Sequence, residues 1–384
     1  MRQAERAIFD LRRGLPILLR DSGTATLVQA VEGLNDRTLG HAQSLSGSIA
    51  QLALSRHRMA ALTGKSNGDA VLLHLSPLPG SAGLGDIAWT RGTKIPTGAQ
   101  IVPADKPALA AIRLLARALL VPAAIVCPVA ATNSDRIEAE LANGNLLAVD
   151  VDEALRLCEV GTAQLTRVSE ARVPLAEAEI SRFVLFREAD GMREHVAIVI
   201  GDRAKWAQDV PVRLHSSCLT GDLFGSLKCD CGEQLRRGVA AINGQGGGVL
   251  LYLSQEGRGI GLANKLRAYG LQDEGLDTID ADQTIGFSQD ERDFRVAHEM
   301  LDQLGVSRIL LLTNNPAKVE ALQRAGVKVT GRQAIYGEIT DQNLRYLHTK
   351  AQRHGHWLHE LLNEQGEPAS ETPERLPAPG SSAS

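Results

Sequence analysis

Short apolar runs alternate with amphipathic stretches along the second half of the chain. Continuous runs rich in Val, Ile and Leu predict buried strands; they cover residues 195–200, 248–253 and 308–313. Stretches with helical spacing cover residues 262–269, 290–304 and 317–325. Strands that alternate with helices usually form a sheet covered by those helices, so this half predicts a layered α/β domain.

The first half shows a similar but weaker pattern. Apolar runs at 70–75 and 124–129 predict strands, and residues 107–120 have helical spacing, which predicts an α/β or α+β domain. A domain boundary is expected near residue 163, because a new alternating stretch follows at 181–187. Residues 364–384 are rich in Pro, Ser and Glu and predict a disordered tail.

Composition narrows the class of protein. The 384 residues are 43% hydrophobic and 22% charged, which is enough for two or three domains with cores of their own. A formal net charge of -4 gives no basic surface for nucleic acid or anionic membranes, so neither is expected as a partner. The uncharged run 118–131 contains two prolines and is too short to span a bilayer. The first residues lack the apolar core of a signal peptide, so a cytoplasmic protein with reduced thiols is expected.

Three of the five cysteines lie in one short segment, at positions 218, 229 and 231. Thiolates bind zinc well, and this spacing lets three of them surround one ion. A structural zinc usually has four protein ligands, whereas a catalytic zinc has three and keeps a position for water. The count therefore favours a catalytic site. Two alternatives stay open: a structural zinc closed by His215, or three buried thiols without a metal.

A glycine-rich turn follows the strand predicted at 248–253 and opens a helix. Backbone amides in such turns favour anions. Within it, the Glu256 carboxylate can accept hydrogen bonds from a purine, and the Arg258 guanidinium can bind phosphate in a bidentate manner. The alternative is a tight connection between a strand and a helix.

Two more segments combine charge with a predicted helix start. Asp290 and Arg292 stand two residues apart at the start of the helix predicted at 290–304. The residues alone favour a solvated first turn whose acids are stabilised by the helix dipole, and a functional pair is the alternative. Thr313 and Lys318 flank Asn-Asn-Pro after the last strand, with Pro316 at an expected first helical position. This pair can hold a phosphate, or the segment is only a turn.

In this order, the segments resemble GTP cyclohydrolase II over roughly residues 164–358. The residues that carry the resemblance are Arg213–Asp222, Cys229–Leu235, Gln255–Leu262, Arg267–Tyr269, Asp277–Thr278, Asp290–Phe294 and Leu312–Lys318. The resemblance implies a layered domain with a mixed sheet. It also implies hydrolysis of GTP to 2,5-diamino-6-(5-phospho-D-ribosylamino)pyrimidin-4(3H)-one, formate and diphosphate, the first step of riboflavin synthesis.

The resemblance also implies the site residues. The implied zinc ligands are Cys218, Cys229 and Cys231, and zinc-bound water would attack C8 of the guanine. Asp290 would accept a proton, Tyr269 would lie close to the reacting ring, and Arg292 would act on the α-phosphate as a nucleophile or by electrostatic stabilisation. The implied GTP contacts are Arg213, Leu214, His215, Ser216, Ser217, Gln234, Glu256, Gly257, Arg258, Thr278, Thr313 and Lys318. Magnesium would accompany the triphosphate, and the chain would form a homodimer.

This sequence departs from the family pattern beside the first cysteine. The family commonly has Glu there, whereas this chain has Ser217. A charged contact beside the metal is thus replaced by a hydroxyl, which leaves open a zinc- and GTP-binding regulatory homologue with impaired catalysis.

Residues 1–163 resemble 3,4-dihydroxy-2-butanone 4-phosphate synthase, which often precedes the cyclohydrolase. The acidic cluster of the synthase pattern is reduced here to Asp21, and the Gly-His-Thr-Glu segment of that pattern is replaced by Pro103-Ala-Asp-Lys-Pro-Ala. Without clustered oxygen ligands a hard cation binds poorly. We expect a degenerate domain that serves as a scaffold or dimer interface, with Cys127 and Cys158 as small buried hydrophobes. The alternative is a bifunctional enzyme with residual synthase activity.

Overall fold

The structure is a computed structural model that describes residues 2–65, 68–160, 164–337 and 374–375. The chain separates into two compact units. Unit 1 contains residues 1–161 and 259–291, and unit 2 contains residues 162–258 and 292–384. The segment 259–291 therefore groups with the N-terminal half, although the sequence placed it in the second domain. Apart from residues 374–375, the tail expected at 364–384 lies outside the described residues.

Unit 1 is built on a seven-stranded sheet with the order β5-β4-β3-β6-β2-β1-β7. Its strands are β1 (Ile17–Asp21), β2 (Thr24–Ala30), β3 (Gln51–Ser55), β4 (Ala70–His74), β5 (Gln100–Pro103), β6 (Ala123–Pro128) and β7 (Leu147–Asp150). Neighbouring strands are antiparallel except β1 and β7, which are parallel. The sheet is therefore mixed.

Helices complete unit 1, and local sequence explains where several of them begin and end. They are α1 (Arg2–Arg12), α2 (Asp36–Ser46), α3 (Arg56–Thr63), α4 (Ser81–Trp89), α5 (Lys106–Arg117), η1 (Ala131–Asn133), α6 (Ser134–Ala142), α7 (Val151–Val160), α10 (Leu262–Asp273) and α11 (Thr278–Thr284). A capping box between Asn35 and Thr38 starts α2, and Gly47 ends it with a left-handed φ of 72°. The Asp105 side chain caps α5, where Pro107 stands in the first turn.

Unit 2 is built on an eight-stranded sheet with the order β15-β14-β13-β11-β12-β10-β9-β8. Its strands are β8 (Leu165–Arg172), β9 (Ser181–Glu188), β10 (Glu194–Ile200), β11 (Val210–Ser216), β12 (Gly248–Leu253), β13 (Arg308–Leu312), β14 (Lys328–Gln333) and β15 (Glu374–Arg375). The four strands β12, β11, β13 and β14 run parallel, and the outer pairs are antiparallel. Because β11, β12 and β13 are parallel, their carboxyl ends lie at one edge of the sheet.

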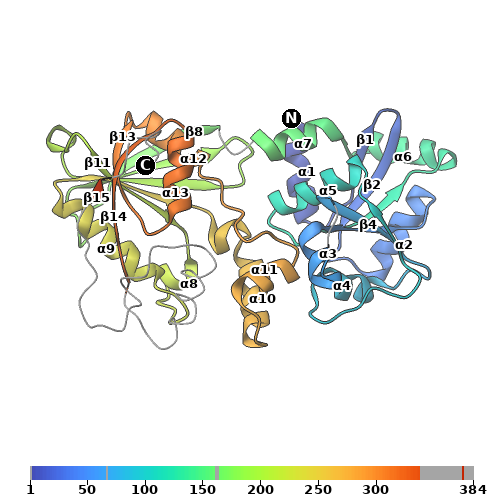
Figure 1. Ribbon diagram of the computed structural model, residues 1–384. Coiled ribbons are helices and arrows are strands. Elements are labelled where there is room, and N and C mark those ends of the chain that lie inside the picture. Colours follow the sequence, from blue (N-terminus) through green and yellow to red (C-terminus); the bar gives the residue numbers. More distant parts are fainter. Residues whose placement is uncertain (1, 66–67, 161–163, 338–373, 376–384) are drawn as a thin grey trace, which may run out of the picture. The chain divides into compact units, whose positions relative to one another are not determined.

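Helices cover both faces of this sheet (Figure 1). The helical elements of unit 2 are η2 (Arg203–Lys205), α8 (Leu219–Asp222), α9 (Cys231–Gly244), η3 (Glu256–Gly259), α12 (Arg295–Gln303) and α13 (Pro316–Arg324). Apolar side chains of α12 and α13 join the core cluster that contains Ala197 and Val199 of β10. Those of α9 join the cluster that contains Ile198 and Ile200. Alternate residues of a strand point to opposite faces, so α9 lies across the sheet from α12 and α13.

The α/β fold class is confirmed in both units, and the mixed sheet expected for the second domain is confirmed in unit 2. The strands expected at 70–75, 124–129, 195–200, 248–253 and 308–313 correspond to β4, β6, β10, β12 and β13. No helix in the described part of the chain is long and apolar enough to cross a membrane.

One expected helix is wrong at its start. The helix predicted from residue 290 begins only at Arg295, so Asp290 and Arg292 precede it. The Asp293 carboxylate accepts hydrogen bonds from the backbone N–H of Arg295 (2.9 Å) and from its guanidinium. A side chain that binds nearby backbone in this way competes with helix formation, which explains the late start.

Truncation of a core side chain tests the packing of unit 1. Leu52 of β3 is fully buried, whereas Leu266 of α10 is 52% exposed. We expect Leu52→Ala to lower the free energy of unfolding by about 2–5 kcal/mol, because it removes buried contacts and leaves a cavity. Leu266→Ala is the matched control and should change it by less than about 0.5 kcal/mol. Urea denaturation followed by circular dichroism measures both. Equal effects would contradict the packing described.

Candidate active site

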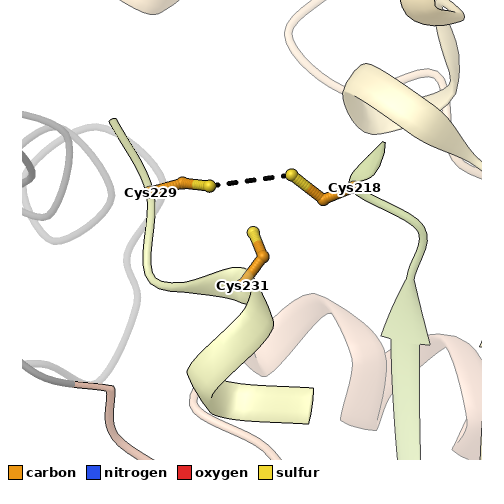
Figure 2. Close-up of side chains that lie close together, drawn as sticks. All are labelled: Cys218, Cys229 and Cys231. Carbon is orange, nitrogen blue, oxygen red and sulfur yellow. Dashed lines mark hydrogen bonds between the residues drawn. The ribbon is translucent and has the colours of Figure 1, made fainter. Parts of the chain in front are cut away.

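The three clustered cysteines lie at the carboxyl edge of the unit 2 sheet, and Figure 2 shows their side chains pointing toward one another. Cys218 follows β11, Cys229 comes from the loop after α8, and Cys231 is the first residue of α9. Their sulfur atoms all lie within 4.8 Å of one another, and the Sγ atoms of Cys218 and Cys229 are 3.6 Å apart. All five cysteines lie in the described part of the chain, and none forms a disulfide.

This geometry fits a tetrahedral metal ion. Zinc–sulfur bonds of about 2.3 Å in a tetrahedron place two sulfurs about 3.8 Å apart, close to the observed distance. The thiols approach so closely because Gly221 has no side chain. A Cβ on Gly221 would lie 2.7 Å from the Cys229 Sγ and 3.1 Å from the Cys218 Sγ. The three thiols therefore lie close enough together to hold one metal ion.

Asp222 fixes the first thiol to the sheet. Its carboxylate accepts hydrogen bonds from the Cys218 backbone N–H and from the Tyr252 hydroxyl, both at 2.9 Å. The His215 Nε2 lies 3.1 Å from the same carboxylate, and the His215 ring stacks on Tyr252 with centroids 5.6 Å apart. Burial lowers the pKa of His215, so its neutral ring donates from Nε2. Within the described residues, the metal-binding group holds the three thiols and no histidine.

The turn after β12 contacts the loop that carries Cys218. Glu256 Oε2 accepts a hydrogen bond of 2.6 Å from the Leu219 N–H, and Oε1 accepts one of 3.1 Å from Gly257. Gly257 and Arg258 both adopt left-handed backbone conformations, with φ of 62°. For Arg258 this costs about 1–2 kcal/mol, because its Cβ crowds the following carbonyl. Such local strain occurs often at functional sites.

Arg213 of β11 and Gln234 of α9 form a pair in which Arg213 is buried and Gln234 is half-buried. Arg213 is 5% exposed, and its guanidinium donates to Gln234 Oε1 at 2.9 Å and to the Leu312 carbonyl at 3.3 Å. Burial lowers the pKa of Arg213 to about 10. Gln234 in turn donates to Asp230 at 2.5 Å. Both predicted contact residues thus hold α9 against the sheet.

Two predicted cationic residues gather around the ring of Phe294. The Arg292 guanidinium carbon lies 5.3 Å from the ring centroid, and Lys318 Nζ lies 5.9 Å from it. Lys318 Nζ also donates to the Leu214 carbonyl at 2.6 Å. Thr313 Oγ1 accepts from the Asn315 N–H at 3.0 Å, at the start of α13. Two cationic side chains, Arg292 and Lys318, therefore lie around Phe294, and Lys318 also contacts the end of β11.

The serines before the first thiol continue the line of β11. Ser217 N–H donates to the Leu253 carbonyl at 2.8 Å, which extends the pairing of β11 with β12. The Ser216 Oγ is buried and has no hydrogen-bond partner among the described residues. An unpartnered buried hydroxyl usually marks a site that a ligand or water completes.

Three predicted residues lie in unit 1, on the segment 259–291. Tyr269 lies on α10, with Lys265 Nζ 5.6 Å from its ring centroid. Thr278 is the first residue of α11, directly after the N-cap Asp277. The Asp290 carbonyl accepts a hydrogen bond from Ser288 Oγ at 3.2 Å. All other predicted site residues lie in unit 2.

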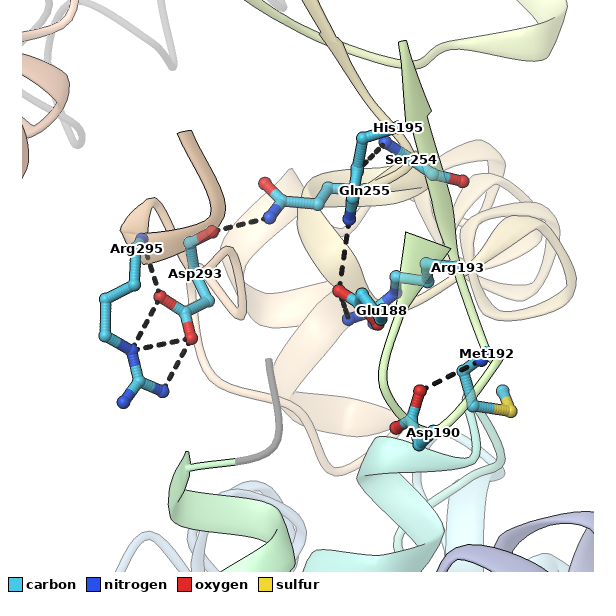
Figure 3. A network of polar contacts seen from close by, with 9 residues as sticks. All are labelled: Glu188, Asp190, Met192, Arg193, His195, Ser254, Gln255, Asp293 and Arg295. Carbon is cyan, nitrogen blue, oxygen red and sulfur yellow. Dashed lines mark hydrogen bonds and ion pairs between the residues drawn. The ribbon is translucent and has the colours of Figure 1, made fainter. Parts of the chain in front are cut away.

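A buried polar network that holds the turn after β12 was not predicted from the sequence. Figure 3 shows His195 between Ser254 and Glu188: Nδ1 accepts from the Ser254 N–H at 3.0 Å, and Nε2 lies 3.1 Å from Glu188 Oε1. Gln255 Nε2 donates to the Asp293 carbonyl at 2.7 Å. The network therefore links the Glu256 turn to the segment with Arg292. Its only sequence signal is a polar His195 within an apolar run.

Comparisons with known proteins identify the family of this chain. A family model described as GTP cyclohydrolase II matches residues 166–334. A GTP cyclohydrolase-2 from Xylella fastidiosa strain 9a5c is 42% identical over 357 residues, which cover 93% of this chain and 87% of the relative. The chain belongs to the GTP cyclohydrolase II family. It is thus a member of a family of hydrolases.

Further relatives carry the same family name. A GTP cyclohydrolase-2 from Azospirillum brasilense is 40% identical over 93% of this chain and 94% of its own length. One from Actinobacillus succinogenes is 49% identical over 51% of this chain and 89% of its own length. A match to the structure of a two-domain 3,4-dihydroxy-2-butanone 4-phosphate synthase from A. baumannii covers 87% of this chain and 99% of that chain. This match has a TM-score of 0.33 and a sequence identity of 17%.

A change at Gly221 tests the close approach of the thiols. We expect Gly221→Ala to weaken zinc binding at least about tenfold, because the added methyl would occupy the space between the sulfurs. Gly244→Ala is the matched control, since a Cβ there meets nothing within 4 Å. Competition with a zinc chelator measures both affinities. Zinc affinity equal to that of the unmodified protein would show that the thiol geometry is wrong.

Proposed function

We propose that this chain hydrolyses GTP to 2,5-diamino-6-(5-phospho-D-ribosylamino)pyrimidin-4(3H)-one, formate and diphosphate, the first step of riboflavin synthesis. The observation that carries the proposal is the three-thiol cluster at the carboxyl edge of a sheet, in a chain of this family. Three thiolates with no fourth protein ligand among the described residues suit a catalytic site better than a structural one.

Zinc is the metal that the donor set favours, because thiolates are soft ligands and the sulfur spacing fits a tetrahedron. Cys218, Cys229 and Cys231 would hold it, and when bound it would supply Lewis-acid activation of water for attack at C8 of guanine. Asp222 keeps the Cys218 backbone in place through the 2.9 Å hydrogen bond from its N–H.

The remaining residues of unit 2 would bind and orient GTP. Glu256 would accept from the guanine while Oε2 also accepts from the Leu219 N–H, because each carboxylate oxygen can accept more than one hydrogen bond. Lys318 and Arg292, the cations beside Phe294, would neutralise phosphate oxygens with Thr313. Arg258 would assist them as a bidentate donor. We favour electrostatic stabilisation over nucleophilic attack for Arg292, because a guanidinium is hard to deprotonate.

Three further residues in the proposal lie on the segment 259–291. Asp290 would accept a proton, Tyr269 would lie near the reacting ring, and Thr278 would contact GTP. These roles follow from the family resemblance. The contacts around GTP would further include Arg213, Leu214, His215, Ser216, Ser217, Gln234 and Gly257. The buried Ser216 Oγ without a partner supports a role for this stretch of β11.

The proposal extends to partners and setting. Magnesium would accompany the triphosphate, because phosphate charge must be neutralised. The protein would be a cytoplasmic homodimer that acts on GTP and binds neither nucleic acid nor membranes. The net charge of -4 supports the absence of a nucleic-acid partner.

For residues 1–163 we propose a degenerate synthase-like domain without synthase activity. Asp21 lies 3.8 Å from the Lys106 ammonium, which also pairs with Asp152 at 2.7 Å. A carboxylate neutralised by lysine is a poor ligand for a hard cation.

The full-length protein should therefore release no dihydroxybutanone phosphate from ribulose 5-phosphate, and measurable product would favour the bifunctional alternative.

Formate release from GTP tests the proposed activity. We expect the zinc-loaded protein to turn GTP over, and Cys229→Ser to lower kcat at least about a thousandfold, because serine is a poor zinc ligand. Cys158→Ser is the matched control outside the cluster and should keep kcat within about twofold. Product mass confirms both hydrolytic steps. If zinc-loaded protein gave no turnover, a binding or regulatory role would replace the enzymatic one.

A further inference from the structure

The segment 259–291 has its contacts with the N-terminal half of the chain. It begins directly after Arg258 and ends directly before Arg292, so both of its ends join residues of the proposed site. It also carries Tyr269, Thr278 and Asp290. The contacts that hold this segment in unit 1 would therefore affect the rate of the proposed reaction as well as the stability of the fold.

Arg58 of α3 clamps the end of α11. Its side chain is buried, with 2% exposed, and its guanidinium donates to main-chain carbonyls. The acceptors are Ile87 at 2.7 Å, Thr284 at 2.8 Å, Thr90 at 2.8 Å and Asp86 at 3.2 Å. A rigid guanidinium with several donors in use fixes orientation more strictly than a single contact does. Arg58 thus ties α11 to the end of α4.

A second contact fixes the residue where the segment leaves α11. Ser55 Oγ donates to the Gly286 carbonyl at 2.5 Å. Gly286 has a φ of +92°, and a Cβ there would lie 3.0 Å from Pro122 and 3.1 Å from Ser55 Oγ. Both the backbone conformation and the close approach require glycine. The chain after α11 therefore packs closely against Ser55 and Pro122.

The other helix of the segment, α10, is held by polar contacts of its own. Arg267 Nη2 donates to Glu32 Oε1 at 2.9 Å, and Glu32 Oε2 accepts from the Val121 N–H at 3.1 Å. Asn264 Nδ2 donates to the Leu119 carbonyl at 3.0 Å. Glu32 therefore links α10 to the chain that enters β6. Polar clamps hold both helices of the segment.

Apolar packing closes the space between these contacts. Ile260, Ala268, Leu271, Ala281, Ile285 and Phe287 form a buried cluster, against which Trp89 and Ala116 pack. The segment thus shares a small core with α4 and α5. Hydrophobic burial of this kind limits independent motion of α10 and α11.

We propose that the N-terminal half has a positioning function in GTP hydrolysis: through Arg58 and Glu32 it holds α10 and α11, and with them Tyr269, Thr278 and Asp290. This inference rests on the proposed function. It assigns the degenerate domain a role in the rate of the reaction without chemistry of its own. Arg58 and Glu32 are positioning residues, and small displacements of reacting groups cost large factors in rate, on the order of a hundredfold per ångström.

Full-length variants test the proposal. We expect Glu32→Gln to lower kcat for formate release about tenfold, and Arg58→Met to lower it further. Arg58→Lys should recover part of the loss, because lysine restores one charged donor. Zinc content and the melting temperature identify variants that misfold, and hydrogen exchange in α10 and α11 should be faster wherever kcat falls. Glu138→Gln is the matched control, because it removes a unit 1 ion pair, to Arg20 at 2.6 Å, that does not touch the segment.

The outcomes separate the two claims. If the unmodified protein releases no formate, the proposed function fails. If it is active, and folded Glu32→Gln and Arg58→Lys match Glu138→Gln in kcat and in hydrogen exchange, the positioning role is wrong. Should Arg58→Met fail to fold, the other two variants still decide. A loss of kcat with full zinc content and faster exchange in α10 and α11 supports the proposal.

Discussion

The carboxylate of Asp222 is the contact on which the candidate metal site depends. It binds the Cys218 N–H, the Tyr252 hydroxyl and the His215 ring at once, and so ties the loop after β11 to β12. Hydrogen bonds to a charged acceptor contribute more than neutral ones, about 1.5–3 kcal/mol each. Because the Asp222 side chain is only 7% exposed, removing one donor would leave a desolvated charge poorly satisfied.

The sheet supplies the second constraint, because the carboxyl ends of three parallel strands place different kinds of side chain at one edge. β11 leads to Cys218, β12 to the Glu256 turn, and β13 to Thr313 and Lys318. The 2.6 Å hydrogen bond from the Leu219 N–H to Glu256 connects the first two of these segments directly. In the proposed function, metal ligation and substrate recognition would therefore be coupled, because a shift of the Glu256 turn would be transmitted to Leu219, the residue beside Cys218.

Much of this arrangement could be predicted from sequence because its signals are local. The spacing of Cys218, Cys229 and Cys231 indicates a shared ion, and continuous apolar runs indicate the central strands. The start of α12 could not be predicted in this way, because the Asp293 side chain binds nearby backbone in place of the first helical turn. Non-local contacts were also out of reach. Arg58 meets Thr284 across 226 residues, and His195 meets Ser254 across 59, so neither role has a local pattern.

In the proposed site, three thiolates hold a zinc ion whose fourth position is open to water. X-ray absorption spectroscopy of the zinc-loaded protein tests it most directly. The account predicts three sulfur atoms at about 2.3 Å and one light atom at about 2.0 Å, without the scattering pattern of an imidazole ring. A fourth ligand identified as histidine would close the site to water and would contradict a catalytic role for the metal.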